Sequence, residues 1–460
     1  MAKPQPYPFK AFRGEIGIDG QWWPIRYQVA TGNDGELRFR VTPMAYTKET
    51  VGLRQAWELR NETVPFFKLR GQSASGVTFS SDHITVSTLG LRTTPTRTTL
   101  TPKLKCSKGA FTRQAEGATN LVFVRLLLRN FEGLVVETHC SLGRVMMRGP
   151  LNSRSRQIVG VLEVSTREPV ADIGEWRARA EALGLHLQRY MSFAQSRLIR
   201  APIQEFWDGA TLETTHWSQT KGCQFAQPVI HSMKLKAYFE HAVAAFFDPP
   251  ITVVNPTYAL EWFAMDASHT EQRLMNAMTA LENMADSNLP TEAATFLPNA
   301  RFQKIAKAMR RAAAAFSSEQ PAPDDDVRAR EAAFLEGLSA KMLDLNRRAL
   351  GDKIKALAAL WGVPIADLIE NDDLTRAIKA RNAIVHRGWY YKPGAATPEQ
   401  RDLWDHVLLM REFTIRFVLT TLQYHGDYLS FRGGQHEVRF EPLPRVTRDG
   451  VFEPAPEPKI

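Results

Sequence analysis

The chain has 460 residues, of which 44% are apolar, 23% are charged and 3 are cysteines. These fractions exclude a disordered chain, a collagen-like chain and a small disulfide-rich domain. The length suggests two or three domains, each with its own core. No apolar run approaches the roughly 18 residues of a membrane span, and residues 1–10 lack the apolar segment of a secretory signal. We therefore expect a cytoplasmic protein with no membrane partner.

The cysteines indicate a reduced protein without a metal centre. Cys106, Cys140 and Cys223 are far apart and form no CxxC pair, which argues against both a disulfide framework and a zinc site. The chain also contains no GxxxxGK[ST] loop for ATP and no GxSxG nucleophile motif. We expect no metal and no cofactor.

Positive charge is concentrated in the N-terminal half. Residues 1–230 carry 30 Lys and Arg residues against 19 Asp and Glu residues, and residues 91–160 alone carry 12 against 3. A basic region attracts polyanions such as RNA by releasing counterions. Solvated faces of strands and loops produce the same pattern without a ligand. Both interpretations stay open from the sequence.

Residues 10–165 have the frequent turn residues that are typical of a β-rich domain. Short alternating or β-branched runs are separated by frequent glycines. Residues 25–29 and 36–41 predict a hairpin, because the connection contains the turn sequence Asn33-Asp34-Gly35. Several such strands in succession predict an N-terminal domain over residues 1–165 that is sandwich-like or a twisted antiparallel sheet.

The rest of the chain predicts a helical bundle. Residues 166–233 are mixed and are interpreted as a connecting region that contains a helix over 172–190. Residues 234–430 predict an all-α bundle, and the proline-rich residues 431–460 predict an extended or disordered tail. The expected helices of the bundle cover residues 233–247, 256–288, 300–317, 325–348, 353–361, 365–386 and 398–424. The fold class is α+β multidomain.

One segment of the bundle carries unusual polar residues on a predicted helix. At about 100° per residue, Arg381 lies within the apolar stripe that includes Leu374 and Val385. Asn382 and His386 follow on one flank of the stripe. Regular geometry separates Arg381 from His386 by about 140°, so a long side chain, a looser last turn or a second subunit must bring them together. The alternative is a snorkelling arginine and a histidine in a fraying helix end.

The Arg381-Asn382-(three residues)-His386 segment, followed by Gly388, resembles the RNxxxH motif of the HEPN superfamily. It is most similar to the Apea-like HEPN domains linked to bacterial defence, in which the motif sits on a late helix of an all-α bundle. The stretch 280–282 resembles the first long helix of that family, and Glu282 is a candidate supporting residue. The β-rich half resembles the N-terminal domains found before such modules.

The resemblance implies metal-independent endoribonuclease chemistry at a dimeric site. RNA supplies its own 2′-OH as nucleophile, His386 moves the proton, Arg381 holds the scissile phosphate and Asn382 orients either partner. The products then carry 2′,3′-cyclic phosphate or 3′-phosphate and 5′-hydroxyl ends. Arg387 and Lys379 are candidate RNA-binding residues, and a homodimer or a higher homo-oligomer is expected.

Three functions remain open at this point. The first is a ribonuclease of anti-phage defence or abortive infection, controlled by an N-terminal domain that senses a phage-derived trigger. The second is a non-catalytic HEPN-like dimerisation or binding protein whose β domain senses a phage or nucleic-acid ligand. The third is a nucleotide- or carbohydrate-binding protein in which the helical half is only an oligomeriser.

Overall fold

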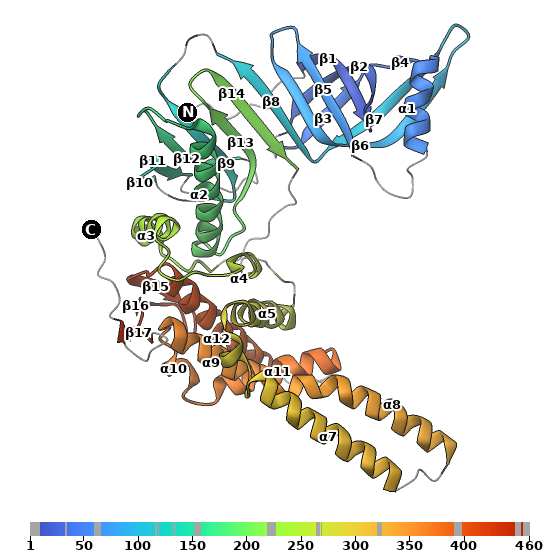
Figure 1. Cartoon of the computed structure of the whole chain (residues 1–460). Helices are drawn as coiled ribbons and strands as arrows, with labels where there is room; N and C mark the ends of the chain where they lie inside the picture. Colours follow the sequence, from blue (N-terminus) through green and yellow to red (C-terminus); the bar gives the residue numbers. More distant parts are fainter. Residues whose placement is uncertain are drawn as a thin grey trace. The chain divides into compact units, whose positions relative to one another are not determined.

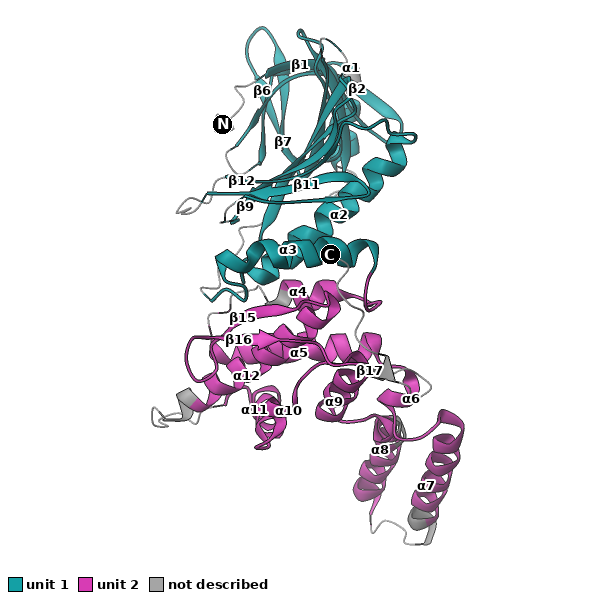
Figure 2. Ribbon diagram, turned by 90° about the vertical axis from the view of Figure 1, so that its left-hand side faces the viewer, with its two compact units in different colours: residues 1–248, 264–266 teal, residues 249–263, 267–460 magenta. Residues whose placement is uncertain are grey.

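Figure 1 shows the computed structural model of the chain, in which a β-rich N-terminal part precedes a helical C-terminal part. The predicted α+β class is therefore confirmed. The chain divides into two compact units (Figure 2): unit 1 holds residues 1–248 and 264–266, and unit 2 holds residues 249–263 and 267–460. The structure describes all residues except 1–9, 33–34, 59–65, 116, 118, 132, 134, 151–157, 219–226, 264–266, 268, 320–323, 391–397, 447–451 and 454–460.

Unit 1 is built on one sheet, and every strand pairing described in it is antiparallel. Its strands are β1 Lys10–Ile18, β2 Gln21–Thr31, β3 Leu37–Val41, β4 Met44–Ala45, β5 Phe67–Ser73, β6 Thr78–Thr93, β7 Thr98–Cys106, β8 Lys108–Gln114, β9 Val122–Arg129, β10 Val136–Cys140, β11 Gly143–Arg148, β12 Gly160–Thr166, β13 Arg200–Trp207 and β14 Thr211–Trp217. Their order is β10-β11-β12-β9-β13-β14-β8-β6-β5-β1-β2-β3, and β7 pairs with β6 and β4. Its helices are α1 Lys48–Glu58, α2 Ile173–Ala194, the 3₁₀ helix η1 Ser232–Lys234 and α3 Leu235–Phe247.

The alternating pattern of the sequence sets the inner face of the first strands. The predicted hairpin is confirmed by the pairing of β2 with β3, in which Tyr27 faces Val41 and Thr31 faces Leu37. Asn33 and Asp34 of the predicted turn lie outside the described residues. On the inner face, the Phe12 and Tyr27 rings stack with centroids 5.4 Å apart. The first strands curl around this aromatic core, since β3 also contacts β7.

The sheet continues through a region that the sequence predicts to be a separate connection. In the structure, β13 and β14 lie between β9 and β8 in the middle of the sheet, so residues 166–233 belong to unit 1. The helix α3 also belongs to unit 1, where it packs against α2 and β10. Unit 2 therefore begins at residue 249 and not at 234. Hydrogen bonds join the described strands of unit 1 into one antiparallel sheet, which is the second of the two predicted arrangements. Local sequence patterns could not choose between the two, because pairing between distant strands is not visible in them.

The helix α2 confirms the prediction over residues 172–190, and its N-cap gives a stability test. The Asp172 side chain accepts a hydrogen bond from the Glu175 backbone N–H at 2.9 Å. We expect Asp172→Ala to lower the free energy of unfolding by about 1 kcal/mol, because it leaves this N–H without its cap. Urea denaturation measures the change. Glu168→Ala is the control, since it removes the same charge from an exposed loop position; an equal loss in both variants would contradict the capping role.

Unit 2 is mostly helical. Its elements are α4 Pro256–Phe263, α5 Thr270–Asn288, α6 Thr291–Ala294, α7 Asn299–Glu319, α8 Asp325–Met342, the 3₁₀ helix η2 Leu343–Asn346, α9 Leu350–Trp361, α10 Ala366–Ile369, α11 Asp373–Arg387, α12 Pro398–Thr421, β15 Gly426–Ser430, β16 His436–Phe440, β17 Arg445–Val446 and β18 Phe452–Glu453. The helix predicted over 256–288 is two helices, and the one predicted over 365–386 breaks at Asp372, which has φ +57°. Part of the predicted tail is ordered structure: β16 pairs with β15, and Phe440 is buried.

The helix α12 forms the centre of unit 2 and packs against α4, α5 and α11. Its Arg416 side chain makes two hydrogen bonds to the Asp367 carboxylate on α10, at 2.5 and 2.7 Å, which lowers the pKa of Asp367. The same arginine donates to the Tyr428 hydroxyl at 3.1 Å, and this hydroxyl donates to the buried Glu412 carboxylate at 2.7 Å. These charge-assisted bonds fix α10 and β15 on α12.

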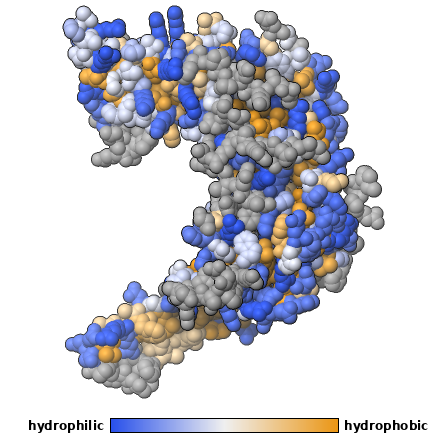
Figure 3. Space-filling model, turned by 180° about the vertical axis from the view of Figure 1, so that it is seen from behind, coloured by the Kyte–Doolittle hydropathy of each residue, from blue (hydrophilic) through white to orange (hydrophobic). Residues whose placement is uncertain are grey.

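The helices α7 and α8 form an antiparallel pair with a partly apolar surface (Figure 3). Ile305, Met309 and Phe334 are exposed on this pair.

No described helix of the chain is long and apolar enough to span a membrane.

Candidate functional site

The predicted motif lies on the last two turns of α11. The buried face of this helix consists of Leu374, Ala377 and Ala380, and these mostly small side chains let α11 pack against α5 and α12. The helix ends at Gly388, which has φ +79° and donates its N–H to the Ile384 carbonyl oxygen at 2.8 Å. Glycine adopts this left-handed conformation without a steric cost, so its place after the motif ends the helix there.

Arg381 and Glu282 connect α11 to α5. The Arg381 Nη2 atom lies 3.1 Å from Glu282 Oε2, and Nη1 donates to Asn382 Oδ1 at 3.2 Å. The Arg381 side chain is 27% exposed and that of Glu282 is 36% exposed. The Arg381 Nε atom is buried and has no hydrogen-bond partner within the described ranges. The structure thus brings together three of the predicted site residues and leaves the guanidinium with an unused donor.

The remaining predicted residues occupy the exposed surface of the same helix. His386, Arg387 and Lys379 are all exposed. Val385 is 49% exposed and Trp389 is 37% exposed. The prediction that Val385 belongs to the buried stripe is wrong, because the buried face of α11 is formed by the positions named above. The end of α11 therefore presents a cationic and partly apolar surface.

His386 and Arg381 are not brought together within one chain. No interaction in the part of the chain that the structure describes joins the two side chains. The two residues are five positions apart, so on a regular helix their side chains point in directions about 140° apart. The helix stays regular up to Arg387. A phosphate held by both groups therefore needs a side-chain rearrangement or a second copy of the helix.

A second polar cluster follows α11 in the chain and was not singled out by the sequence. The Tyr390 hydroxyl donates to Asp402 Oδ2 at 2.9 Å, and the other oxygen of this carboxylate lies 3.9 Å from His406 Nε2. Burial lowers the pKa of His406 below its usual value. The four-residue spacing of Asp402 and His406 on α12 is the one sequence signal that could have indicated this contact.

The end of α11 carries the guanidinium of Arg381, the amide of Asn382 and the exposed imidazole of His386. Such groups can bind a phosphate and transfer a proton without a metal. Comparison of the chain with protein-family models, with curated proteins and with solved structures finds no match. The site is therefore defined by the sequence motif and by the contacts of α11 and α5.

Proposed function

We propose that the chain is a metal-independent endoribonuclease whose site lies at the end of α11. The observation that carries the proposal is the contact of Arg381 with both Asn382 and Glu282, beside an exposed His386. The carboxylate and the amide hold the guanidinium in one orientation. A guanidinium held in this way can bind a phosphate through its remaining N–H donors.

In this proposal each side chain has one chemical task. The RNA 2′-OH attacks the adjacent phosphorus, so the protein supplies no nucleophile. His386 transfers the proton, Arg381 stabilises the charge on the phosphate oxygens, and Asn382 keeps the guanidinium oriented. The exposed Arg387 and Lys379 attract the RNA backbone. The leaving group is a 5′-hydroxyl.

A second copy of the chain completes this site in our proposal. Val385 and Trp389 are exposed next to His386, which suits the packing of one α11 against another. A two-fold arrangement would let the imidazole of one copy approach the guanidinium of the other. The β-rich unit 1 would control the activity in response to a phage-derived trigger.

The test is cleavage of single-stranded RNA by the full chain in excess EDTA. We expect fragments with 2′,3′-cyclic phosphate or 3′-phosphate and 5′-hydroxyl ends, identified by mass spectrometry. Because the trigger is not identified, the same ends are also sought in total RNA from cells that overproduce the chain. Absence of such ends in both assays, or cleavage that EDTA abolishes, would contradict the proposal.

A non-catalytic role of the helical unit is the second candidate. The Arg381–Glu282 ion pair at 3.1 Å favours it, because a purely structural arginine between two helices makes the same contact. In this case His386→Ala leaves the biological function of the chain unchanged, and deletion of unit 1 abolishes it.

A further inference from the structure

Positively charged side chains gather on the outer face of the first strands of unit 1. Burial alternates along β1, β2 and β5, which are neighbours in the sheet, so their exposed positions share the face opposite the aromatic core of Phe12 and Tyr27. We name this surface the cationic face and define it by Arg13, Glu15, Trp22, Arg26, Lys68 and Arg70. Within the described residues of these strands, the face carries four cations and a single carboxylate, that of Glu15.

Two of the cations lie side by side. Arg13 on β1 stands directly opposite Arg26 on β2, and both are exposed. Neither guanidinium makes an ion pair or a side-chain hydrogen bond within the described ranges. Like charges directly opposite each other on paired strands destabilise a sheet. An anion bound between the two guanidinium groups removes this repulsion, so the pair is suited to a phosphate.

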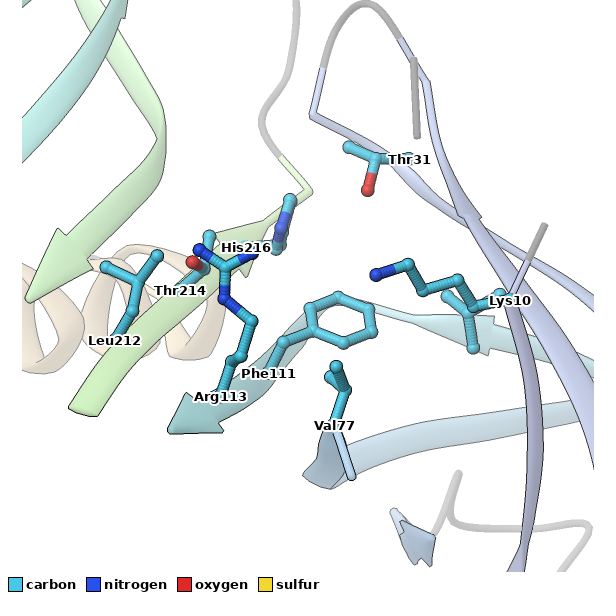
Figure 4. Close-up of a pocket in the computed structure, with 9 residues that line it drawn as sticks. Lys10, Thr31, Val77, Phe111, Arg113, Leu212, Thr214 and His216 are labelled. Atoms are coloured by element: carbon cyan, nitrogen blue, oxygen red, sulfur yellow. The ribbon is translucent and has the colours of Figure 1, made fainter. Parts of the chain in front are cut away.

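A cavity of about 440 Å³ adjoins this arginine pair. Arg13, Arg26, Thr42 and Thr47 are among the residues that line it, and both threonines are exposed. The opposite face of the sheet is different, because the cavity beside the Phe111 ring has a volume of about 80 Å³ (Figure 4). The outer cavity therefore has room for a phosphate and its sugar, and its hydroxyl groups can bind their oxygens.

A flat, charged platform lies next to the arginine pair on the same face. The Arg70 side chain donates to Glu15 Oε2 from Nε at 3.0 Å and from Nη2 at 2.7 Å. Its Cζ atom lies 4.2 Å from the centroid of the Trp22 ring. The carboxylate and the ring together hold the guanidinium in one plane. The Arg70 side chain is 60% exposed, so a nucleobase can stack on its open side.

We propose that the cationic face binds single-stranded RNA. Phosphates bind Arg13, Arg26 and Lys68, and a base stacks on the platform of Arg70 and Trp22. Phosphate contacts supply the affinity and stacking holds the strand in place, without a preference for one base. This binding does not require cleavage at α11, and it assigns to unit 1 a partner of its own.

The groups on the face favour a single RNA strand over three other polyanions. A duplex keeps its bases stacked inside and cannot use the platform. DNA lacks the ribose 2′-hydroxyl, which the exposed Gln72 amide can bind from its position directly opposite Arg13 on β5. An anionic membrane requires apolar side chains that insert between lipids, and Trp22, the large apolar side chain of the face, is covered by Arg70.

Fluorescence anisotropy with a labelled oligouridylate of about 20 nucleotides tests the proposal. The full chain carries His386→Ala, so that the RNA stays intact and the result does not depend on the proposed cleavage. We expect a dissociation constant of about 1 μM or tighter at about 50 mM salt. Oligodeoxyuridylate and duplex RNA of the same length should bind at least about threefold more weakly.

Vesicles that contain phosphatidylserine are the fourth ligand, measured by sedimentation, and should not retain the chain. Absence of oligouridylate binding would overturn the proposal. Equal or tighter binding of the deoxy strand or the duplex, or sedimentation of the chain with the vesicles, would also overturn it.

A double variant locates the RNA on the cationic face. Arg13→Gln with Arg26→Gln should weaken binding at least about tenfold. The slope of log K against log salt concentration should become shallower by about 1.4, because each phosphate contact to a single strand contributes about 0.7. Differential scanning calorimetry should show an unchanged or higher melting temperature, since the variant removes the repulsion between the two strands.

The matched control is Arg113→Gln with Arg167→Gln. It removes the same charge from the inner cavity of Figure 4 and from an exposed position before α2. RNA binding should stay within about twofold of the parent chain, because neither residue lies on the cationic face. Equal weakening by the two double variants would place the RNA elsewhere and overturn the proposal.

Trp22→Leu separates stacking from charge. It removes the ring beneath the Arg70 guanidinium and should weaken oligouridylate binding about fivefold, the lower end of the usual contribution of one stacked base. The salt dependence should stay unchanged, because no phosphate contact is lost. Binding equal to that of the parent chain would contradict the stacking platform.

Discussion

The substitution His386→Ala is expected to lower the rate of RNA cleavage by about two to four orders of magnitude, the usual contribution of a general acid or base. His386 is exposed at the end of α11, so its removal leaves the core unchanged. The effect should therefore appear in the rate and not in the thermal stability. Single-turnover cleavage of an end-labelled RNA in EDTA measures the rate, and differential scanning calorimetry measures the stability.

The matched control for this experiment is His269→Ala. His269 is exposed at the start of α5, and its side chain makes no cap hydrogen bond. This variant should cleave RNA at the wild-type rate. Arg381→Lys gives an independent check, because it keeps the charge but loses the planar fork that binds phosphate through two N–H groups. Wild-type cleavage by His386→Ala would remove the histidine from the mechanism.

The substitution Gly14→Ala is expected to destabilise unit 1 by about 3 kcal/mol, at the upper end of typical overpacking costs. Gly14 on β1 faces Gly71 on β5, and the two backbones approach closely at this point. An added Cβ would overlap the Arg70 carbonyl oxygen and would lie 2.5 Å from the Gly71 Cα. The clash involves backbone atoms of paired strands, so it cannot be relieved by a side-chain rotation.

Gly90→Ala is the matched control for this prediction. Gly90 also lies within a strand, but a Cβ there would meet its nearest neighbour, the Thr101 carbonyl oxygen, at 3.6 Å. This is an ordinary contact, and the change should be close to neutral. Hydrogen exchange followed by mass spectrometry measures both variants. Faster exchange of β1 and β5 amides in Gly14→Ala only is the expected result, and equal protection in both variants would contradict it.

Several elements could be predicted because local patterns specify them. The alternation along β2, the capped amphipathic helix α2 and the glycine that ends α11 each depend on residues close together in the chain. The position of β13 and β14 within the sheet could not be predicted, since it depends on pairing with β9 and β8, which are distant in sequence. The break at Asp372 was also missed, because a left-handed non-glycine residue has no clear sequence signal.

The sequence by itself determined that an arginine, an asparagine and a histidine share the end of one helix, because helical spacing follows from local residues. Only the tertiary structure decided that Glu282 meets Arg381, since these residues are far apart in the chain and share a contact through the packing of α5 on α11.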